Sequence, residues 1–573
     1  MTLTKKPSIA VVEAPSHCSR SRRRILFLSF EFNYSPFSGN GVLCRSLVSG
    51  LLNDNDDNNN NNNNTDVAIR VICAKPHPST PNLSSDIELT HNKNLLIWPV
   101  QLKQQQQSTA DGGTQQWKRL DRYGPWKEFA SALLGDDDNI NFRECIEQFE
   151  PTDVVAVDWH GMLAWQAFCS SSSSSSTTTR RRLWRKQVNV CYYNFRVYSS
   201  SSWGKEKDQD TSSSSSSDDQ FYTEMELLSC CLADGIICLS EHDKCALQQL
   251  MMMQDSNNDK DEVNLLREQK KIREITILPP PLRGDVCKLA RMLDIQQLPE
   301  QQQEEEESIS SSSSPFINDL PEEVKKAMEY VHQQQQQYKS TIPQQQRQRL
   351  FLTCVSRLSP EKSPHIFVNL IQQLGGVDFL RKYCLVPILC GARSVDSYAN
   401  EVIQSFQSVC RSSPNDDWPC VVIDHHLGPN ELAAIFSHTA LNVHPCLYDA
   451  YGMTMVESSA FGVPSVVNAG GKVGAAALLG ENEGCVALDL SEMEGEVADG
   501  KIGMNCSATK LLREILVSRV QHATSTSPQW SRSCSALARV AKEARHRALG
   551  WDELSCCRGL IEKLNSLNNE KEG

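Results

Sequence analysis

The chain has 573 residues, of which 39% are hydrophobic and 22% are charged, and this composition predicts a soluble protein with cores of ordinary size. It excludes a collagen-like or wholly disordered chain. The 57 basic and 70 acidic residues give a net charge of -13. A general nucleic-acid-binding protein must neutralise many phosphates, so this charge argues against nucleic acid as a partner.

Cysteine usage and the first residues indicate a cytoplasmic protein. None of the 22 cysteines forms a C-x-x-C motif, and two pairs are directly adjacent in the sequence, so reduced thiols are expected rather than a disulfide framework. The first apolar run, residues 25–30, is much shorter than a signal sequence core or a membrane span of about 20 residues. We therefore expect no transmembrane segment.

Tracts of Asn, Gln and Ser interrupt the chain. Such tracts bury too little apolar surface to offset the entropy of ordering them, so they are predicted to form surface loops or linkers. They occupy residues 53–64, 104–107, 170–176, 199–217, 301–314 and 333–348.

Between the tracts, the first half of the chain alternates short apolar runs with helical patterns. This alternation is typical of parallel strands in an α/β sheet. The predicted strands are residues 25–30, 67–73, 154–157, 188–193 and 235–239, and the predicted helices are residues 43–52 and 142–149.

The second half repeats the pattern and predicts a second Rossmann-like sheet. Its predicted strands are residues 350–355, 386–390, 421–423, 440–444 and 465–467, and its predicted helices are residues 365–374, 430–437 and 453–461. Two such sheets that face each other place a ligand site in the cleft between them. The predicted organisation is a disordered tail (1–24), a first domain (25–282), a low-complexity linker (283–347), a second domain (348–540) and a closing helix that returns to the first domain (541–573).

Two segments of the first domain are candidates for the cleft. Gly39 and Gly41 follow the first strand at the start of a helix, where glycine allows the backbone to approach a ligand closely. The same two glycines are equally compatible with an ordinary turn. Asp158 and His160 follow a later strand and are candidates for the acceptor side, although Asp158 is equally suited to capping the next helix.

The second domain supplies two cations directly after its first strand. Arg357 and Lys362 lie in the segment FLTCVSRLSPEK. Arginine can bind a phosphate through two hydrogen bonds and lysine acts as a point charge, so the pair could stabilise a diphosphate leaving group without a metal.

The strongest pattern is HPCLYDAYGMTMVESSAFGVPSVV, which begins at His444. Gly452 directly precedes a helix whose first amides, those of Met453 and Thr454, form an anion site. A carboxylate aimed at bound phosphate would repel it, so Glu457 is expected to accept hydrogen bonds from a diol such as that of a ribose. The alternative is an ordinary crossover helix with an exposed glutamate.

Asp449-x7-Glu457 within these flanks resembles the E-x7-E signature of the retaining GT-B glycosyltransferases, especially family four. The resemblance implies a GT-B fold and a metal-independent hexosyltransferase that needs no cofactor. The donor would be a nucleotide-diphosphate-sugar, and the acceptor a glycan, lipid or small molecule with a hydroxyl group. The implied roles are sugar contact by Asp449, leaving-group stabilisation by Arg357 and Lys362, and donor binding by Gly452, Met453, Thr454, Glu457, Gly39 and Gly41.

Several positions depart from the family pattern. The first acidic position is Asp449 rather than Glu, Ser356 replaces a glycine, and Tyr193 and Asn194 occupy the stretch where several members have a sugar-contacting His. These departures keep open the alternative of a catalytically weak or inactive nucleotide-sugar-binding protein of the same fold. A sugar-nucleotide epimerase is a second alternative, because it would bind phosphate in the same way.

Overall fold

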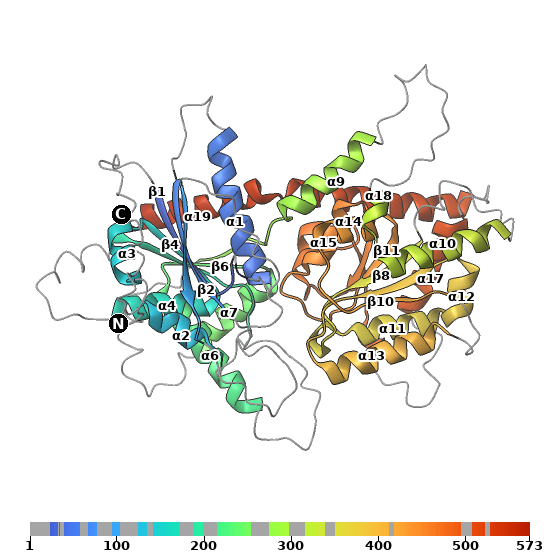
Figure 1. Ribbon diagram of the computed structural model, residues 1–573, viewed down its shortest axis with the longest axis horizontal. Coiled ribbons are helices and arrows are strands. Elements are labelled where there is room, and N and C mark those ends of the chain that lie inside the picture. Colours follow the sequence, from blue (N-terminus) through green and yellow to red (C-terminus); the bar gives the residue numbers. More distant parts are fainter. Residues whose placement is uncertain are drawn as a thin grey trace, which may run out of the picture.

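The computed structural model describes residues 23–32, 34, 39–57, 67–76, 94–103, 124–133, 141–170, 187–198, 215–253, 274–296, 316–337, 350–411, 418–493, 507–521 and 528–572. The predicted tail lies outside these ranges except for Arg23 and Arg24, which begin the first strand. The described chain forms two lobes, each built on one parallel sheet with helices packed on it (Figure 1). Among the described residues, no helix is long and apolar enough to cross a membrane.

The first lobe contains a seven-stranded sheet with the order β3-β2-β1-β4-β5-β6-β7, in which all pairs are parallel. The five predicted strands are confirmed, whereas β3 and β7 were not predicted. The strands are β1 (Arg23–Ser29), β2 (Val67–Lys75), β3 (Leu95–Gln101), β4 (Asp153–Val157), β5 (Asn189–Tyr193), β6 (Gly235–Cys238) and β7 (Ile275–Ile277).

Both faces of this sheet are buried, which explains why its strands are continuous apolar runs rather than alternating ones. In β1, Ile25 and Phe27 belong to one core cluster, whereas Leu26 and Leu28 belong to the cluster on the opposite face. The helices of the lobe are α1 (Gly39–Asp57), α2 (Trp126–Ala132), α3 (Phe142–Phe149), α4 (Asp158–Ser170), α6 (Ser215–Leu232) and α7 (Glu241–Met253).

The second lobe contains a six-stranded parallel sheet with the order β10-β9-β8-β11-β12-β13. The five predicted strands are confirmed, and β13 is additional. The strands are β8 (Phe351–Val355), β9 (Val386–Cys390), β10 (Val421–Ile423), β11 (Thr439–His444), β12 (Ser465–Asn468) and β13 (Val486–Leu488). The helices are α11 (Pro364–Leu374), α12 (Gly376–Lys382), α13 (Asp396–Val409), α14 (Pro429–Ser437), α15 (Met453–Ala460), α16 (Gly474–Leu479) and α17 (Ser507–Gln521).

The segment predicted as a low-complexity linker, residues 283–347, contains two helices. α9 (Gly284–Gln296) packs against α14 and α15, and α10 (Glu322–Gln337) packs against β9 and β10. These two stretches form helices rather than a linker because their apolar residues recur with helical spacing. In α10, for example, Val324, Met328 and Val331 are buried on one face. The Gln/Ser-rich residues 301–314 between the helices lie outside the described residues.

The end of the chain crosses from the second lobe to the first. α18 (Pro528–Gly550) packs on the second lobe, and α19 (Glu553–Glu572) packs on α1, β5 and β6 of the first lobe (Figure 1). Trp551 lies at the crossing, where its Nε1 donates to the carbonyl of Pro279 at 3.2 Å and its carbonyl accepts from Leu282 N at 2.9 Å. The crossing therefore lies beside the segment that leaves the first lobe.

We expect Gly391→Ala to destabilise the second lobe. Gly391 follows β9 with φ +155°, and a Cβ there would lie 1.7 Å from the carbonyl oxygen of Ser356, in the loop that carries Arg357. Such overpacking costs about 1–3 kcal/mol or more. Gly550→Ala is the control, because a Cβ at Gly550 would meet nothing within 4 Å. Urea denaturation of both variants tests this, and equal midpoints would contradict it.

Candidate functional site

The candidate site lies where the loops after β8 and β11 of the second lobe meet the first lobe. The β8 loop carries Arg357 and Lys362, and the β11 loop carries Tyr448 and Asp449. Because carboxyl ends of parallel strands meet at one edge of a sheet, the two loops are neighbours. Tyr448 also contacts Asp243 of the first lobe, so this edge faces the cleft.

Lys362 and Asp449 form the centre of the site. Lys362 Nζ lies 2.6 Å from Asp449 Oδ2, and His444 Nε2 lies 3.1 Å from the same oxygen. Burial alone would raise the pKa of the Asp449 carboxyl, but the Lys362 ammonium and the His444 ring hold that pKa well below its usual range. Burial alone would lower the pKa of His444, but Cys446 and Asp449 raise it to about 10. Asp449 is therefore a carboxylate held between two cationic groups.

Gly452 and the start of α15 lie beside this pair. Gly452 has φ +87° and precedes α15, and no side chain caps the first amides of the helix. A Cβ at Gly452 would lie 3.2 Å from His444 Nε2, so glycine is needed both for the backbone conformation and for space. Met453 begins α15, and Thr454 Oγ1 donates to the carbonyl of Val355 at 3.0 Å, which ties the helix to the end of β8. The amides predicted to bind an anion therefore lie at the centre of the site.

Arg357 lies in the same loop as Lys362 but forms a different contact. Its Nη2 lies 3.3 Å from Glu361 Oε1, and its side chain is 45% exposed. The structure thus brings Lys362 to Asp449 but does not bring Arg357 into that pair.

Glu457 lies one turn into α15 and is paired across the molecule. Its Oε1 lies 3.4 Å from Nη1 of Arg283, the residue that follows the segment leaving the first lobe. Arg283 also binds Asp285 through two nitrogens at 3.1 and 2.9 Å. Burial raises the pKa of Glu457, and the Arg283 charge opposes that rise. Glu457 is therefore a buried partner of Arg283 rather than the exposed residue of an ordinary crossover helix.

The candidates of the first lobe form a buried cluster. Asp158 has φ +59° and accepts from Trp159 N at 2.7 Å and from Asn40 Nδ2 at 3.0 Å. Asn40 lies between Gly39 and Gly41, so the glycine segment and Asp158 are brought together. His160 Nδ1 lies 3.8 Å from Asp158 Oδ2. Burial raises the pKa of Asp158 to about 7. Asp158 thus accepts hydrogen bonds from the backbone of Trp159 and from Asn40, and both its predicted roles, at the acceptor side and as a helix cap, stay predictions.

Gly39 itself packs against an aromatic ring. A Cβ at Gly39 would lie 2.0 Å from Phe195 Cζ, so glycine is required there by this close approach. The packing against Phe195 explains why residue 39 is a glycine, and this explanation needs no bound ligand.

Tyr448 and Asp243 join the two lobes. Tyr448 Oη donates to Asp243 Oδ1 at 2.8 Å, and Ser240 Oγ donates to Asp243 Oδ2 at 2.7 Å. Asp243 is fully buried, and burial raises its pKa to about 6. Because Tyr448 directly precedes Asp449, this contact fixes the loop that carries the central carboxylate.

We expect acidification to stabilise the wild type relative to Asp243→Asn. The native pKa of about 6 lies above the ordinary aspartate pKa of 3.8, so the native state holds the proton more tightly. The corresponding stability is fully present below about pH 4 and is lost as the pH rises through about 6. A shift of this size corresponds to at most on the order of 3 kcal/mol. Urea denaturation at about pH 4.5 and pH 7.5 measures the difference, and parallel profiles for the two proteins would contradict it.

Sequence analysis missed Arg283, Asp243, Tyr448 and Cys446 as members of this region. Tyr448 and Cys446 lie inside the strongest motif and close to Asp449 in the sequence, and this proximity is the signal that could have identified them as site residues. No comparable sequence pattern surrounds Asp243 or Arg283. Each is far in the sequence from the site residue that it contacts, so only the fold brings it there.

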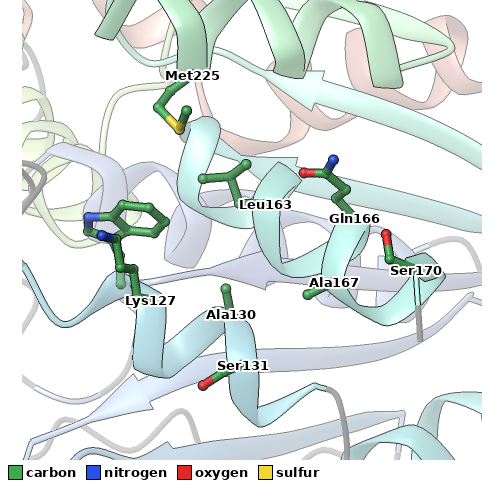
Figure 2. Close-up of a pocket in the computed structure, with 9 residues that line it drawn as sticks. Lys127, Ala130, Ser131, Leu163, Gln166, Ala167, Ser170 and Met225 are labelled. Atoms are coloured by element: carbon green, nitrogen blue, oxygen red, sulfur yellow. The ribbon is translucent and has the colours of Figure 1, made fainter. Parts of the chain in front are cut away.

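A separate pocket of about 390 Å³ lies in the first lobe between α2, α4 and α6 (Figure 2). It contains none of the predicted site residues. Lys127 is the only charged side chain among its described lining residues, so they offer no acid–base pair. The lining residues are Trp126, Lys127, Ala130, Ser131, Leu163, Gln166, Ala167, Ser170 and Met225.

Comparison with known proteins identifies the fold. No protein-family model and no curated protein matches the chain. Among solved structures, sucrose-phosphate synthase from Thermosynechococcus elongatus is similar with a TM-score of 0.54 and 13% identity, over 95% of this chain and 99% of that chain. An α,α-trehalose-phosphate synthase (UDP-forming) from Burkholderia vietnamiensis gives a TM-score of 0.54 and 11% identity, over 96% and 98% of the two chains.

A third structure, the trehalose-6-phosphate protein of E. coli bound with UDP-2-fluoro glucose, gives a TM-score of 0.52 and 12% identity, over 94% of this chain and 98% of that chain. The fold is GT-B. This confirms the predicted fold class. The GT-B arrangement also accounts for the site, because the strands of both sheets end at the cleft between the lobes.

Proposed function

We propose that the protein is a retaining glycosyltransferase of the family-four type. It moves a hexosyl group from a nucleotide-diphosphate-sugar to a hydroxyl group of an acceptor. The observation that carries this proposal is the Lys362–Asp449 pair, 2.6 Å apart, beside Gly452 and the uncapped amides of α15. A cation and helix amides can bind a diphosphate, and a carboxylate can bind the hydroxyl groups of the attached sugar.

In this proposal each group contacts a different part of the donor. The amides of Gly452, Met453 and Thr454 hold the diphosphate, because a helix N-terminus favours anions. Lys362 neutralises the charge that develops on the leaving diphosphate. Asp449 accepts hydrogen bonds from the sugar hydroxyls, and Arg357, on the same loop as Lys362, is assigned to the leaving diphosphate.

Glu457 binds the ribose diol of the nucleotide. Its pairing with Arg283 supports this role, because the Arg283 charge opposes the rise that burial causes in the pKa of Glu457 and so favours the carboxylate form. A charged carboxylate is a stronger hydrogen-bond acceptor than a neutral one.

The retaining outcome is proposed to arise by attack of the acceptor on the same face that the leaving group departs from. The low pKa of Asp449 makes it a weak nucleophile, which favours this course over a covalent intermediate on that carboxylate. The acceptor, a glycan, lipid or small molecule, would bind on the first lobe, with Asp158 and His160 as the buried candidates for that side.

The direct test is a panel of nucleotide-diphosphate-sugars offered to the purified full-length chain. Isothermal titration calorimetry measures binding, and release of the nucleoside diphosphate measures slow hydrolysis or transfer. One donor should bind and be turned over. Binding of none of the donors would overturn the proposal.

A second candidate is an inactive nucleotide-sugar-binding protein. The observation that favours it is that Asp449 is occupied by Lys362 and His444 while Glu457 is occupied by Arg283. The same panel separates the two candidates, because an inactive protein binds a donor but releases no nucleoside diphosphate.

We expect turnover to continue after treatment with a chelator. In the proposed mechanism Lys362 and the α15 amides stabilise the leaving group, so a divalent metal is not required. Donor turnover is measured before and after EDTA treatment and dialysis. Complete loss that manganese restores would contradict this prediction.

A further inference from the structure

Three side chains of different ligand chemistry lie together on the β11 loop. His444 ends β11, Cys446 follows two residues later, and Asp449 follows three residues after that. Their ligand atoms, one from each residue, all lie within 4.8 Å of one another. Residues two apart on an extended chain point to the same side, which places His444 and Cys446 together. The Asp449 carboxylate joins them, because its Oδ2 lies 3.1 Å from His444 Nε2.

The donor set of this cluster selects one class of cation. Imidazole nitrogen, cysteine sulfur and carboxylate oxygen are the ligands that zinc takes, often as three protein groups with a fourth position left open. Calcium and magnesium prefer oxygen ligands and fit the cluster poorly. Ligand atoms around tetrahedral zinc lie about 3.5 Å apart, so the cluster needs only a small contraction.

The cluster is enclosed on one side and open on the other. His444 and Cys446 are buried, whereas Lys362 and Asp449 retain 16% and 12% exposure of their side chains at the cleft. His444 Nδ1 is buried and has no hydrogen-bond partner among the described residues. Lys362 Nζ lies 2.6 Å from Asp449 Oδ2, so a positive charge is already accommodated at the open side.

We propose that His444, Cys446 and Asp449 bind a zinc-class divalent cation, which displaces Lys362 from Asp449. The ammonium and the metal compete for the same carboxylate, because two cations this close repel each other strongly. Metal binding releases protons from the thiol and the ring. The bound metal blocks sugar transfer, since Lys362 then no longer stabilises the leaving group and Asp449 no longer binds the sugar hydroxyls. This blocking rests on the proposed function, whereas metal binding does not.

Titration of the EDTA-treated full-length chain with Co²⁺ tests the site without any sugar donor. A thiolate ligand gives cobalt a charge-transfer absorption, and Zn²⁺ added afterwards should remove it. Competition with a chromophoric chelator gives the zinc affinity. The chain has 22 cysteines, so the result is read as a difference between variants.

Cys446→Ser should lose one bound metal and the corresponding absorption, with zinc affinity at that site reduced by on the order of 100-fold or more. Cys390→Ser is the matched control, because Cys390 is a buried thiol at the end of β9 in the same sheet. Equal cobalt absorption in Cys446→Ser and Cys390→Ser would overturn the site.

Lys362→Met provides a test that misfolding cannot imitate. Removal of the competing ammonium should increase zinc affinity by about tenfold or more, which corresponds to about 1.4 kcal/mol or more. Unchanged or weaker zinc binding in this variant would overturn the proposed competition. If the wild type binds one zinc at this site but the metal-free protein turns over no donor, the metal site stands and the glycosyltransferase proposal fails.

Discussion

Lys362→Ala should lower donor turnover by on the order of 10²-fold, the range for removal of one preorganised charge from a leaving group. The Lys362 ammonium lies 2.6 Å from Asp449 and beside the α15 amides, where the diphosphate is expected. Lys362 acts on charge that develops on the leaving group in the transition state, so its removal should mainly lower kcat. Steady-state kinetics with a working donor measure it.

Two further variants make this result specific. Lys362→Arg keeps the charge and should retain more turnover than Lys362→Ala, whereas Lys382→Ala removes an exposed lysine at the end of α12 and should change nothing. Circular dichroism of each variant shows whether the fold is retained. An unchanged rate in a folded Lys362→Ala protein would remove Lys362 from the reaction.

Glu457→Gln and Asp449→Asn should affect different kinetic parameters. Glu457 is assigned to a ribose diol that is held equally in the ground and transition states, so its loss should weaken donor binding and leave saturated turnover unchanged. A charge-assisted hydrogen bond contributes about 1.5–3 kcal/mol, which corresponds to roughly 10- to 150-fold in the donor Kd. Asp449 lies beside the reacting sugar, so Asp449→Asn should instead lower kcat.

The Arg283 pairing makes this comparison sharper. Arg283→Met removes the partner of Glu457 without touching the carboxylate, and it should weaken donor binding in the same direction as Glu457→Gln. If Glu457→Gln lowers saturated turnover while donor affinity stays the same, the ribose assignment is wrong and the two carboxylates have exchanged roles.

The two sheets could be predicted because parallel strands buried on both faces are continuous apolar runs with clear ends. β3 and β7 escaped prediction for different physical reasons. β3 contains Pro99 and an exposed Leu96, so its pattern is that of an edge strand, and β7 has only three residues. α10 escaped because its buried positions are embedded in a Glu- and Gln-rich stretch.

The sequence motifs identified Lys362, Asp449 and Glu457 as candidates, but they could not predict which residues these side chains contact. Lys362 and Asp449 are 87 residues apart in the sequence, and Arg283 and Glu457 are 174 apart. Strand order decides which loops become neighbours, and no local pattern encodes it. The buried environment of Asp158 likewise depends on Asn40, which is 118 residues away.

The return of α19 to the first lobe makes that lobe a discontinuous domain. Arg23 Nη1 donates to Asn565 Oδ1 at 2.9 Å, Asn189 Nδ2 to Asn568 Oδ1 at 2.6 Å, and Cys557 Sγ to the carbonyl of Leu47 at 3.2 Å. A Cβ at Gly50 would lie 2.6 Å from Cys557 Sγ, so α1 and α19 are closely packed.

The first lobe therefore lacks one of its packing partners until α19 has been made. Domains usually fold in the order in which the ribosome releases them. Here the second lobe can be complete while the surface of α1, β5 and β6 still lacks α19. The first lobe thus depends on a helix that is synthesised after the second lobe, so the order of synthesis and the order of domain completion are reversed.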